Sequence, residues 1–196
     1  KGDETGFQYK SLPQYSYLQK KQEIRAKKPV LCRITGLFGS SATGRKFKVL
    51  IIGKSANPRA FMDVRNLPVY YYHNKTAWMT KDIFRDWFVN CFLLEVQPIL
   101  DPDMQIQFLM DNCSSHNDIQ LNDLDPQVQI RFLPPNTTSL IQPMDQAVLA
   151  CVKAPQKKQF YMKLVNYCDQ NEEPGAYKLF LKKYTIFDAI NDIVAG

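Results

Sequence analysis

Three aspartates, Asp3, Asp111 and Asp145, are the side chains best suited to building a shared chemical site. Carboxylates are hard oxygen donors that suit Mg²⁺ or Mn²⁺. Two such ions about 3.5–4 Å apart stabilise both the attacking and the leaving oxygen in phosphoryl transfer. Three carboxylates within about 5 Å would repel one another by roughly 3 kcal/mol per pair at an effective dielectric near 20. We therefore expect that these aspartates, if they meet, gain stability from divalent cations.

The elements that carry the aspartates are placed to bring them together. A first strand is expected from Asp3 to Tyr9, and the apolar run Ile106–Met110 predicts a buried central strand that ends at Asp111. A helix is expected to begin near Pro143, because proline is tolerated in a first turn, and Asp145 then lies in that turn. Ligands of open α/β sheets bind beyond the carboxyl ends of the strands, where Asp111 lies.

The other strand signals predict a mixed sheet. Val30–Phe38 and Phe47–Ile52 are rich in β-branched and aromatic residues and flank a glycine- and serine-rich turn, so the chain is expected to open with three meandering strands. Val69–Tyr72 predicts a further short strand, and Val128–Leu133 predicts the last one. The order of elements indicates an α/β domain with a mixed sheet rather than a doubly wound parallel sheet.

The helix signals place one helix before the central strand and several at the end of the chain. Thr80 is a good N-cap, and apolar residues then recur at i, i+3 and i+4 as far as Val96. This amphipathic helix is expected to cover the sheet. The residues from about Lys157 predict further helices.

Composition narrows the class of protein. The chain has 196 residues and is 45% apolar, which suits one globular domain. Its 25 Lys and Arg against 19 Asp and Glu give a net charge of +6, which suits a polyanionic partner without requiring one. The five cysteines never form a C-x-x-C pair, which argues against a zinc site or a disulfide framework and favours a reducing compartment. No apolar run is long enough to span a bilayer, so we expect no membrane partner.

Five ordered blocks resemble the DDE catalytic domain of pogo/Tigger transposases, within the mariner superfamily. The blocks are Asp3–Gly6, Ile52–Arg59, Ala77–Thr80, Met110–His116 and Leu133–Gln146. The resemblance implies a ribonuclease-H-like α/β fold with a mixed five-stranded sheet flanked by helices. It also implies that residues 1–196 form a single catalytic domain, and that a helix-turn-helix DNA-binding region precedes it in a longer protein.

The same resemblance implies a function and a site. Asp3, Asp111 and Asp145 would form the catalytic triad and hold two Mg²⁺ or Mn²⁺ ions. The ions would activate water and then a 3′-hydroxyl, so that transposon ends are cut and joined to target DNA in the nucleus. DNA is then the expected partner, and a homodimer stays open.

Two other functions stay open beside the transposase. One is a domesticated nuclear protein that binds DNA or chromatin through its upstream region and uses this domain as an inactive scaffold or dimerisation surface. The other is a different ribonuclease-H-like nuclease with the same metal chemistry, which the ordered blocks disfavour.

Where the family has a basic helix after the last aspartate, Pro155 is expected to break or kink the helix, which weakens the case for DNA contacts there.

Basic residues outside the triad are predicted to contact DNA. Lys27, Lys28, Lys54 and Arg59 could neutralise phosphates, and an ordinary exposed surface is the alternative. His116 could contact DNA or help to place the nucleophile, although a lone histidine in a turn more often makes local hydrogen bonds.

Two further sets of residues are expected to stay outside the chemistry. Glu4 should point to the opposite face of its strand from Asp3, so it is not counted as a metal ligand. Trp78 and the run Tyr70–Tyr72 could stack on bases, but aromatic residues beside a strand and a helix start are more often packed, and we assign them to packing.

Overall fold

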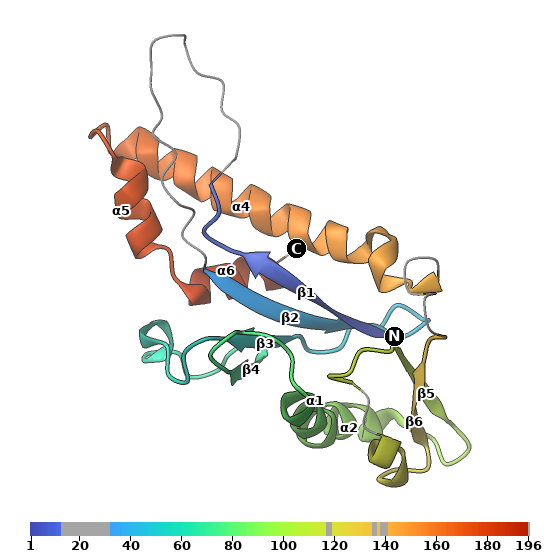
Figure 1. Ribbon diagram of the computed structural model, residues 1–196. Coiled ribbons are helices and arrows are strands. Elements are labelled where there is room, and N and C mark those ends of the chain that lie inside the picture. Colours follow the sequence, from blue (N-terminus) through green and yellow to red (C-terminus); the bar gives the residue numbers. More distant parts are fainter. Residues whose placement is uncertain (13–31, 117–118, 135–136, 138–140, 196) are drawn as a thin grey trace.

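A four-stranded mixed sheet lies at the centre of the molecule (Figure 1). The computed structural model describes residues 1–12, 32–116, 119–134, 137 and 141–195. The strands, in spatial order, are β1 (Gly2–Gln8), β2 (Arg33–Gly39), β3 (Leu50–Gly53) and β4 (Tyr70–His73). The first three pair antiparallel as a meander, which confirms the prediction, and β4 pairs parallel to β3.

Two further strands, β5 (Ile106–Met110) and β6 (Val128–Phe132), pair in parallel with each other. Both were predicted, but the single five-stranded sheet is not observed, because these strands form a ladder separate from the sheet of four. Side chains of β5 lie against the start of β1. A Cβ added to Gly2 would lie 2.6 Å from Cζ of Phe108 and 3.2 Å from Sδ of Met110. Strand β5 therefore meets the start of β1 through its side chains, and no backbone ladder joins the two strands in the described part of the chain.

One face of the sheet is covered by a helical segment that starts where the sequence predicted. Its parts, in order, are α1 (Lys81–Trp87), η2 (Phe88–Phe92), α2 (Leu93–Val96) and η3 (Gln97–Ile99). The Thr80 hydroxyl accepts the N–H of Ile83 at 3.3 Å, which confirms the N-cap. Phe84, Phe88 and Phe92 are buried from successive turns, and the rings of Phe92 and Phe108 lie 4.5 Å apart. This core fixes β5 beneath the sheet.

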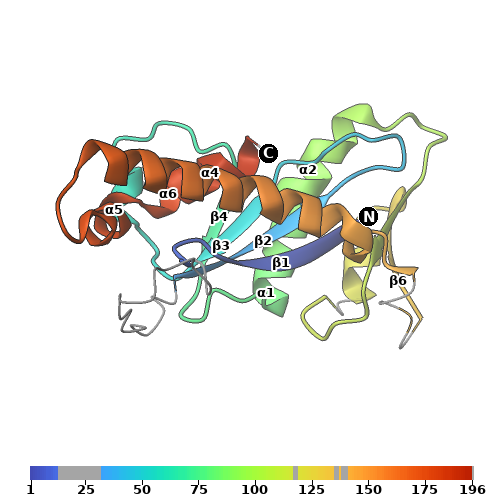
Figure 2. The ribbon, with the colours of Figure 1, turned by 90° about the horizontal axis from the view of Figure 1, so that it is seen from above.

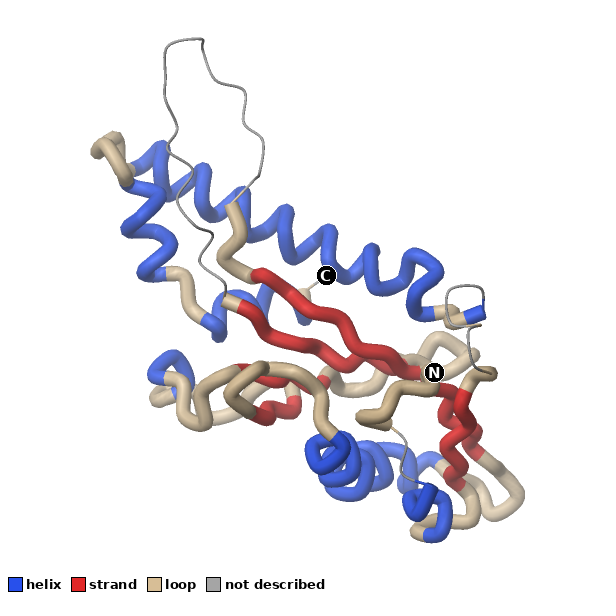
Figure 3. The backbone as a smooth tube through the Cα atoms, viewed as in Figure 1, coloured by secondary structure: helices blue, strands red, loops and turns tan. Residues whose placement is uncertain are grey.

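The other face is covered by three helices, α4 (Leu149–Gln170), α5 (Ala176–Lys183) and α6 (Ile186–Val194). Figures 1 and 3 show α4 and the α1–α2 segment on opposite sides of the strands. Phe160 of α4 packs against Tyr184, with ring centroids 5.0 Å apart, and Thr185 caps α6 through a capping box with Asp188. The predicted helical end of the chain is confirmed.

The expected break at Pro155 is wrong, since α4 continues through this residue. The chain departs from helical geometry earlier, inside η5 (Met144–Val148), where Gln146 has ψ 69° and Ala147 has φ 68°. A proline keeps a helical φ and removes only one backbone donor, so a helix packed along its length can retain it. The irregular point thus lies directly after Asp145.

The remaining helices are single turns, η1 (Arg59–Phe61) and η4 (Ile119–Asp123). Among the residues that the structure describes, every helix is too short or too polar to span a lipid bilayer.

Candidate active site

Asp3 lies near the start of β1 and is only 8% exposed. Its Oδ1 accepts the backbone N–H of Glu4 at 2.8 Å. Burial raises the pKa of the Asp3 carboxyl to about 7, and the negative charges of Asp145, Asp111 and Glu4 act in the same direction, against the hydrogen bond, which lowers it. Asp3 is therefore a buried acid, and the charged residues that act on it are also acids.

The three aspartates come together from three separate elements. Asp111 follows β5 at the end that meets the start of β1, and η5, which carries Asp145, also contacts β1. The charges of Asp145 and Asp111 both act on Asp3, so each of them lies on the same side of the molecule as Asp3, but the three carboxyl groups do not come within 4.8 Å of one another. Figures 1 and 2 agree that the N-terminus and the start of α4 lie at the same end of the sheet.

Asp145 occupies a single turn that begins at Pro143, as the sequence predicted. Its backbone N–H donates to the carbonyl of Gln142 at 3.2 Å, and the positive φ of Ala147 then redirects the chain into α4. Because Asp145 is exposed while Asp3 is buried, the group presents one open and one enclosed carboxylate.

His116 joins two acids in a bridge that the sequence did not reveal. Its Nδ1 lies 2.7 Å from Oδ1 of Asp111, and its Nε2 lies 2.8 Å from Oε1 of Glu4. The imidazole is 1% exposed and its ring lies 5.0 Å from that of Phe84. The prediction that His116 contacts DNA does not fit this burial, whereas the alternative of a local hydrogen-bonding group does. Residues 4 and 116 are so distant in the chain that no spacing signal could have paired them.

The bridge favours a charged imidazole. Burial alone lowers the pKa of His116, but the hydrogen bonds to Asp111 and Glu4, together with their charges, outweigh it and raise the pKa to about 10. A protonated His116 can donate from both ring nitrogens, which satisfies both carboxylates. One oxygen of Asp111 is thus held by His116, and among the described residues no hydrogen bond to the other oxygen is found.

Glu4 points to the opposite face of β1 from Asp3, as the strand period predicts. Asp3 pairs across the sheet with Phe38, which packs in the core beneath α4, and Glu4 pairs with Leu37, which packs in the core beneath α1. Glu4 nevertheless belongs to the cluster, because its carboxylate reaches Asp111 through His116. A ligand atom from each of Glu4, Asp111 and His116 lies within 4.8 Å of the others, but a protonated His116 has no free lone pair, so this group could bind a metal only if the imidazole lost a proton.

The predicted DNA-contacting lysines and arginine lie away from this cluster or outside the described residues. Strand β3 runs in the same direction as β1, and Lys54 and Arg59 follow its end, whereas Asp3 lies near the start of β1. They are therefore toward the other end of the sheet. Lys27 and Lys28 fall outside the described residues. The DNA contacts of these four residues stay a prediction.

Of the aromatic residues assigned to packing, one is not packed. Tyr70, Tyr71 and Tyr72 pack against the two cores, as expected. Trp78 is 54% exposed and stacks on the guanidinium of Arg33 instead. The cause lies in the preceding residue, since Ala77 occupies the buried position beside the strand.

Comparison with known families identifies the superfamily of this chain. A family model described as DDE superfamily endonuclease matches residues 32–195. The chain belongs to the DDE superfamily endonucleases. Membership implies the ribonuclease-H-like fold and a transposase-derived domain, and the superfamily generally uses divalent metals. The matched range contains Asp111 and Asp145 but not Asp3.

Individual relatives of this DDE domain are transposon-derived proteins. The chain is 34% identical to human Tigger transposable element-derived protein 7 over 184 residues, which is 88% of this chain and 34% of that protein. It is 35% identical to mouse Tigger transposable element-derived protein 4 over 60% of this chain and 22% of that protein, and 30% identical to mouse Jerky protein over 82% and 27%. The chain thus spans about a third or less of these relatives. No solved structure matches it.

Proposed function

We propose that this DDE domain catalyses metal-dependent DNA cleavage and strand transfer, with Asp3, Asp111 and Asp145 as its catalytic and metal-binding residues. The observation that carries the proposal is that β1, β5 and η5, the elements that carry or precede the three aspartates, meet at one end of the sheet. Separate elements meeting in this way make a site that depends on the fold as a whole.

The donor set fits Mg²⁺ or Mn²⁺. All three groups are hard oxygen donors, and the neighbours that act on Asp3 through their charge are all acids, so a divalent cation would offset a surplus of negative charge. Such cations stabilise the attacking and leaving oxygens of a phosphodiester and promote ionisation of the nucleophile.

The residues of this chain would hold the site in shape. The backbone N–H of Glu4 orients the Asp3 carboxylate, and His116 orients that of Asp111. Packing of Phe84 against the imidazole restrains His116 in turn. Asp145 is exposed and stands where a DNA strand can approach. His116 is in this account a positioning residue rather than a DNA contact.

We further propose that residues 1–196 act as one catalytic domain, and that β1 and β5 are neighbours in a single ribonuclease-H-like arrangement of five core strands. The close approach of Gly2 to Phe108 and Met110 supports that neighbourhood. The substrate would be transposon ends and target DNA, in the nucleus. Assembly as a homodimer would bring two such sites to paired DNA ends.

A second function is favoured by the His116 bridge. A charged imidazole between Glu4 and Asp111 partly neutralises the cluster without any metal. A domesticated protein could retain this arrangement as a stable scaffold while its DNA or chromatin contacts are made elsewhere in the longer protein. The names of the relatives, which call them transposable element-derived, agree with either outcome.

Nicking of supercoiled plasmid with Mn²⁺ separates the two functions. We expect nicking by the wild type and a loss of about 1000-fold in Asp111→Ala, because several kcal/mol of transition-state stabilisation are removed. Asp101→Ala is the matched control, since Asp101 is exposed and precedes β5, at the other end of this strand from Asp111. Equal nicking by the wild type and Asp111→Ala, or none by either, would favour the scaffold.

A further inference from the structure

Trp78 and Arg33 form a second feature, which the proposed chemistry leaves unused. Trp78 lies in the loop between β4 and α1 and is 54% exposed, and Cζ of Arg33 lies 3.4 Å from the centroid of its ring. We propose that this pair is a docking platform for one nucleotide of a DNA strand, with the base stacked on Trp78 and the phosphate bound by Arg33. The identity of the ligand rests on the proposed function, but the test does not require catalysis.

Within the described part of the chain, Arg33 is a cation without an acidic partner. Its guanidinium lies between the indole and the backbone of Gly6, where an added Cβ would come within 3.0 Å of Nη2 and 3.1 Å of Cζ. The buried Nε has no hydrogen-bond partner, and no ion pair of Arg33 is found among the residues that the structure describes. A guanidinium carries five donors in a planar fork that matches the oxygens of a phosphate. A bound anion would provide a hydrogen-bond acceptor for the unpartnered Nε of Arg33.

The loop that carries Trp78 is rigidly built. The side-chain oxygen of Asn74 accepts the N–H groups of Thr76 at 3.1 Å and Trp78 at 3.3 Å, and its amide nitrogen donates to the Trp78 carbonyl at 2.6 Å. The Thr35 hydroxyl of β2 donates to the carbonyl of Ala77 at 2.6 Å. The Asn74 bonds hold the loop together up to Trp78, and the Thr35 bond ties it to the sheet.

This rigidity is maintained against local strain. Ala77 is fully buried at φ 55°, a left-handed conformation that costs a residue with a Cβ about 1–2 kcal/mol. The result is that alanine fills the interior and the large indole is held in solvent. A stacking surface that is fixed in advance loses little entropy when a base binds. The geometry therefore favours a ligand-binding role over loose surface packing.

The platform lies on the face of β1 that carries Glu4, which is the face opposite Asp3. Gly6 and Glu4 are on the same face of β1, two residues and thus about 7 Å apart. The platform is therefore close to the His116 bridge along β1, and a ligand bound there need not reach Asp3.

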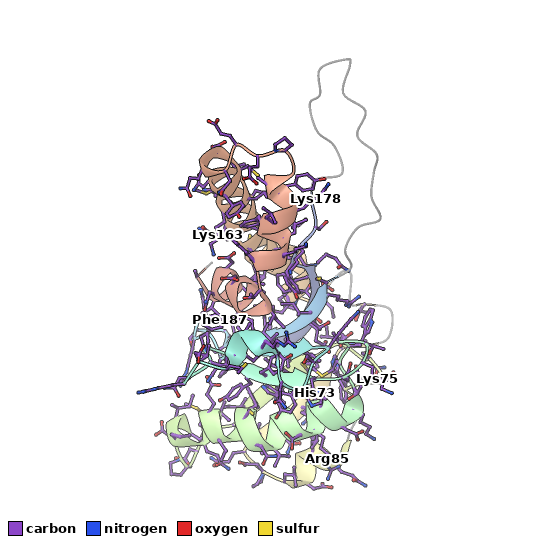
Figure 4. The ribbon with its side chains drawn as sticks, turned by 90° about the vertical axis from the view of Figure 1, so that its left-hand side faces the viewer. His73, Lys75, Arg85, Lys163, Lys178 and Phe187 are labelled. Carbon is purple, nitrogen blue, oxygen red and sulfur yellow. The ribbon has the colours of Figure 1, made fainter. Side chains whose placement is uncertain are left out.

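A similar pair elsewhere lacks these surroundings. Tyr177 on α5 is exposed, and Nζ of the adjacent Lys178 lies 5.7 Å from the centroid of its ring. In Figure 4, Lys178 lies on α5, far from Lys75, which belongs to the loop of Trp78. Tyr177 is therefore a matched control for an exposed aromatic ring beside a cation.

Binding of a labelled single-stranded oligothymidylate, measured by fluorescence anisotropy in EDTA, tests the platform. We expect Trp78→Ala to weaken binding about tenfold or more, as the loss of one base stack does. Trp78→Phe should stay within about threefold, because it keeps an aromatic ring. Arg33→Gln should reduce the slope of log affinity against log salt by about 0.7, the value for one phosphate on a single strand. Tyr177→Ala should match the wild type.

Intrinsic fluorescence gives an independent readout, because the chain has two tryptophans and Trp87 is buried. DNA should quench the wild type, and the quenching should disappear in Trp78→Phe, which folds around the same loop. Unchanged affinity and salt slope in Trp78→Ala and Arg33→Gln would overturn the platform, as would failure of the wild type to bind the single strand. If those variants bind normally while the wild type nicks plasmid, the platform fails and the proposed function stands. If those variants lose binding and the wild type does not nick, the platform stands and the proposed function fails.

Discussion

Two groups of charged side chains lie along α4, and they differ in how their charge is balanced. Toward the carboxyl end of the helix, Asp192 of α6 is 4% exposed, pairs with Lys163 and accepts the Tyr184 hydroxyl at 2.7 Å. At the other end, Asp3 is surrounded by Asp145, Asp111 and Glu4, which all act on it with the same sign of charge. The first cluster is matched within the protein, and the second is not.

The difference separates a structural role from a functional one. A buried carboxylate with a cation and a hydroxyl as partners joins two helices and requires nothing else. A cluster with an excess of carboxylates lowers the stability of the protein that contains it, unless a cation from solution binds. Figure 4 shows Lys163 on the helical layer above the sheet, within the matched group. Removing the charge of Asp192 should therefore lower the free energy of unfolding, whereas removing the charge of Asp3 should raise it.

The largest effect is expected in the matched cluster. Asp192→Ala leaves Lys163 and Tyr184 without their partner and should lower the free energy of unfolding by about 3 kcal/mol. Lys163→Met should cost less, because Lys163 is 43% exposed and solvent screens its charge. Urea denaturation measures both. A loss below about 0.5 kcal/mol in Asp192→Ala would remove the contrast between the clusters.

A smaller effect is expected from His116, the imidazole cation in the unmatched cluster. Its pKa is raised from 6.5 to about 10, so its stabilising contribution is complete below pH 6.5 and is lost as the pH rises through about 10. His116→Gln should therefore cost about 2 kcal/mol at pH 6 and progressively less toward pH 10, as measured by urea denaturation in EDTA. A cost that does not change with pH would contradict a charged bridge.

The smallest effect should have the opposite sign. The pKa of Asp3 is raised from 3.8 to about 7, so ionising it destabilises the folded state progressively between pH 4 and pH 7. Asp3→Asn keeps the oxygen that accepts the Glu4 N–H and removes the charge. We expect it to raise the free energy of unfolding by about 1 kcal/mol at pH 8 in EDTA, with little change at pH 4. Destabilisation at pH 8 would mean that Asp3 is already balanced inside the protein.

Much of the fold could be predicted because the local signals are strong. The hairpin turn, the Thr80 cap and the apolar strand before Asp111 each act over a few residues, and the structure contains all three. The five-stranded sheet could not be checked in the same way, since the relation of β1 to β5 involves contacts between residues far apart in the chain, such as Gly2 with Phe108 and Met110. Such packing has no local sequence signal.

The site was predictable to the extent that its residues end predicted elements. Asp111 and Asp145 follow a strand end and a helix start, whereas the His116 bridge depends on a contact between residues 4 and 116. Trp78 was misassigned because an aromatic residue between a strand and a helix is usually buried. The left-handed conformation of Ala77 turns the alanine inward and Trp78 outward. An alanine in the sequence gives no sign of such a conformation.

Binding of Mn²⁺ by the apoprotein, followed by electron paramagnetic resonance, tests the central claim most directly. The unmatched cluster predicts saturable binding that is lost in Asp111→Asn and kept in the control Asp101→Asn. At 100 times the dissociation constant, the ion should also stabilise the wild type by about 2.7 kcal/mol and leave Asp111→Asn unchanged. No saturable binding by the wild type, or equal binding by Asp111→Asn, would contradict the account.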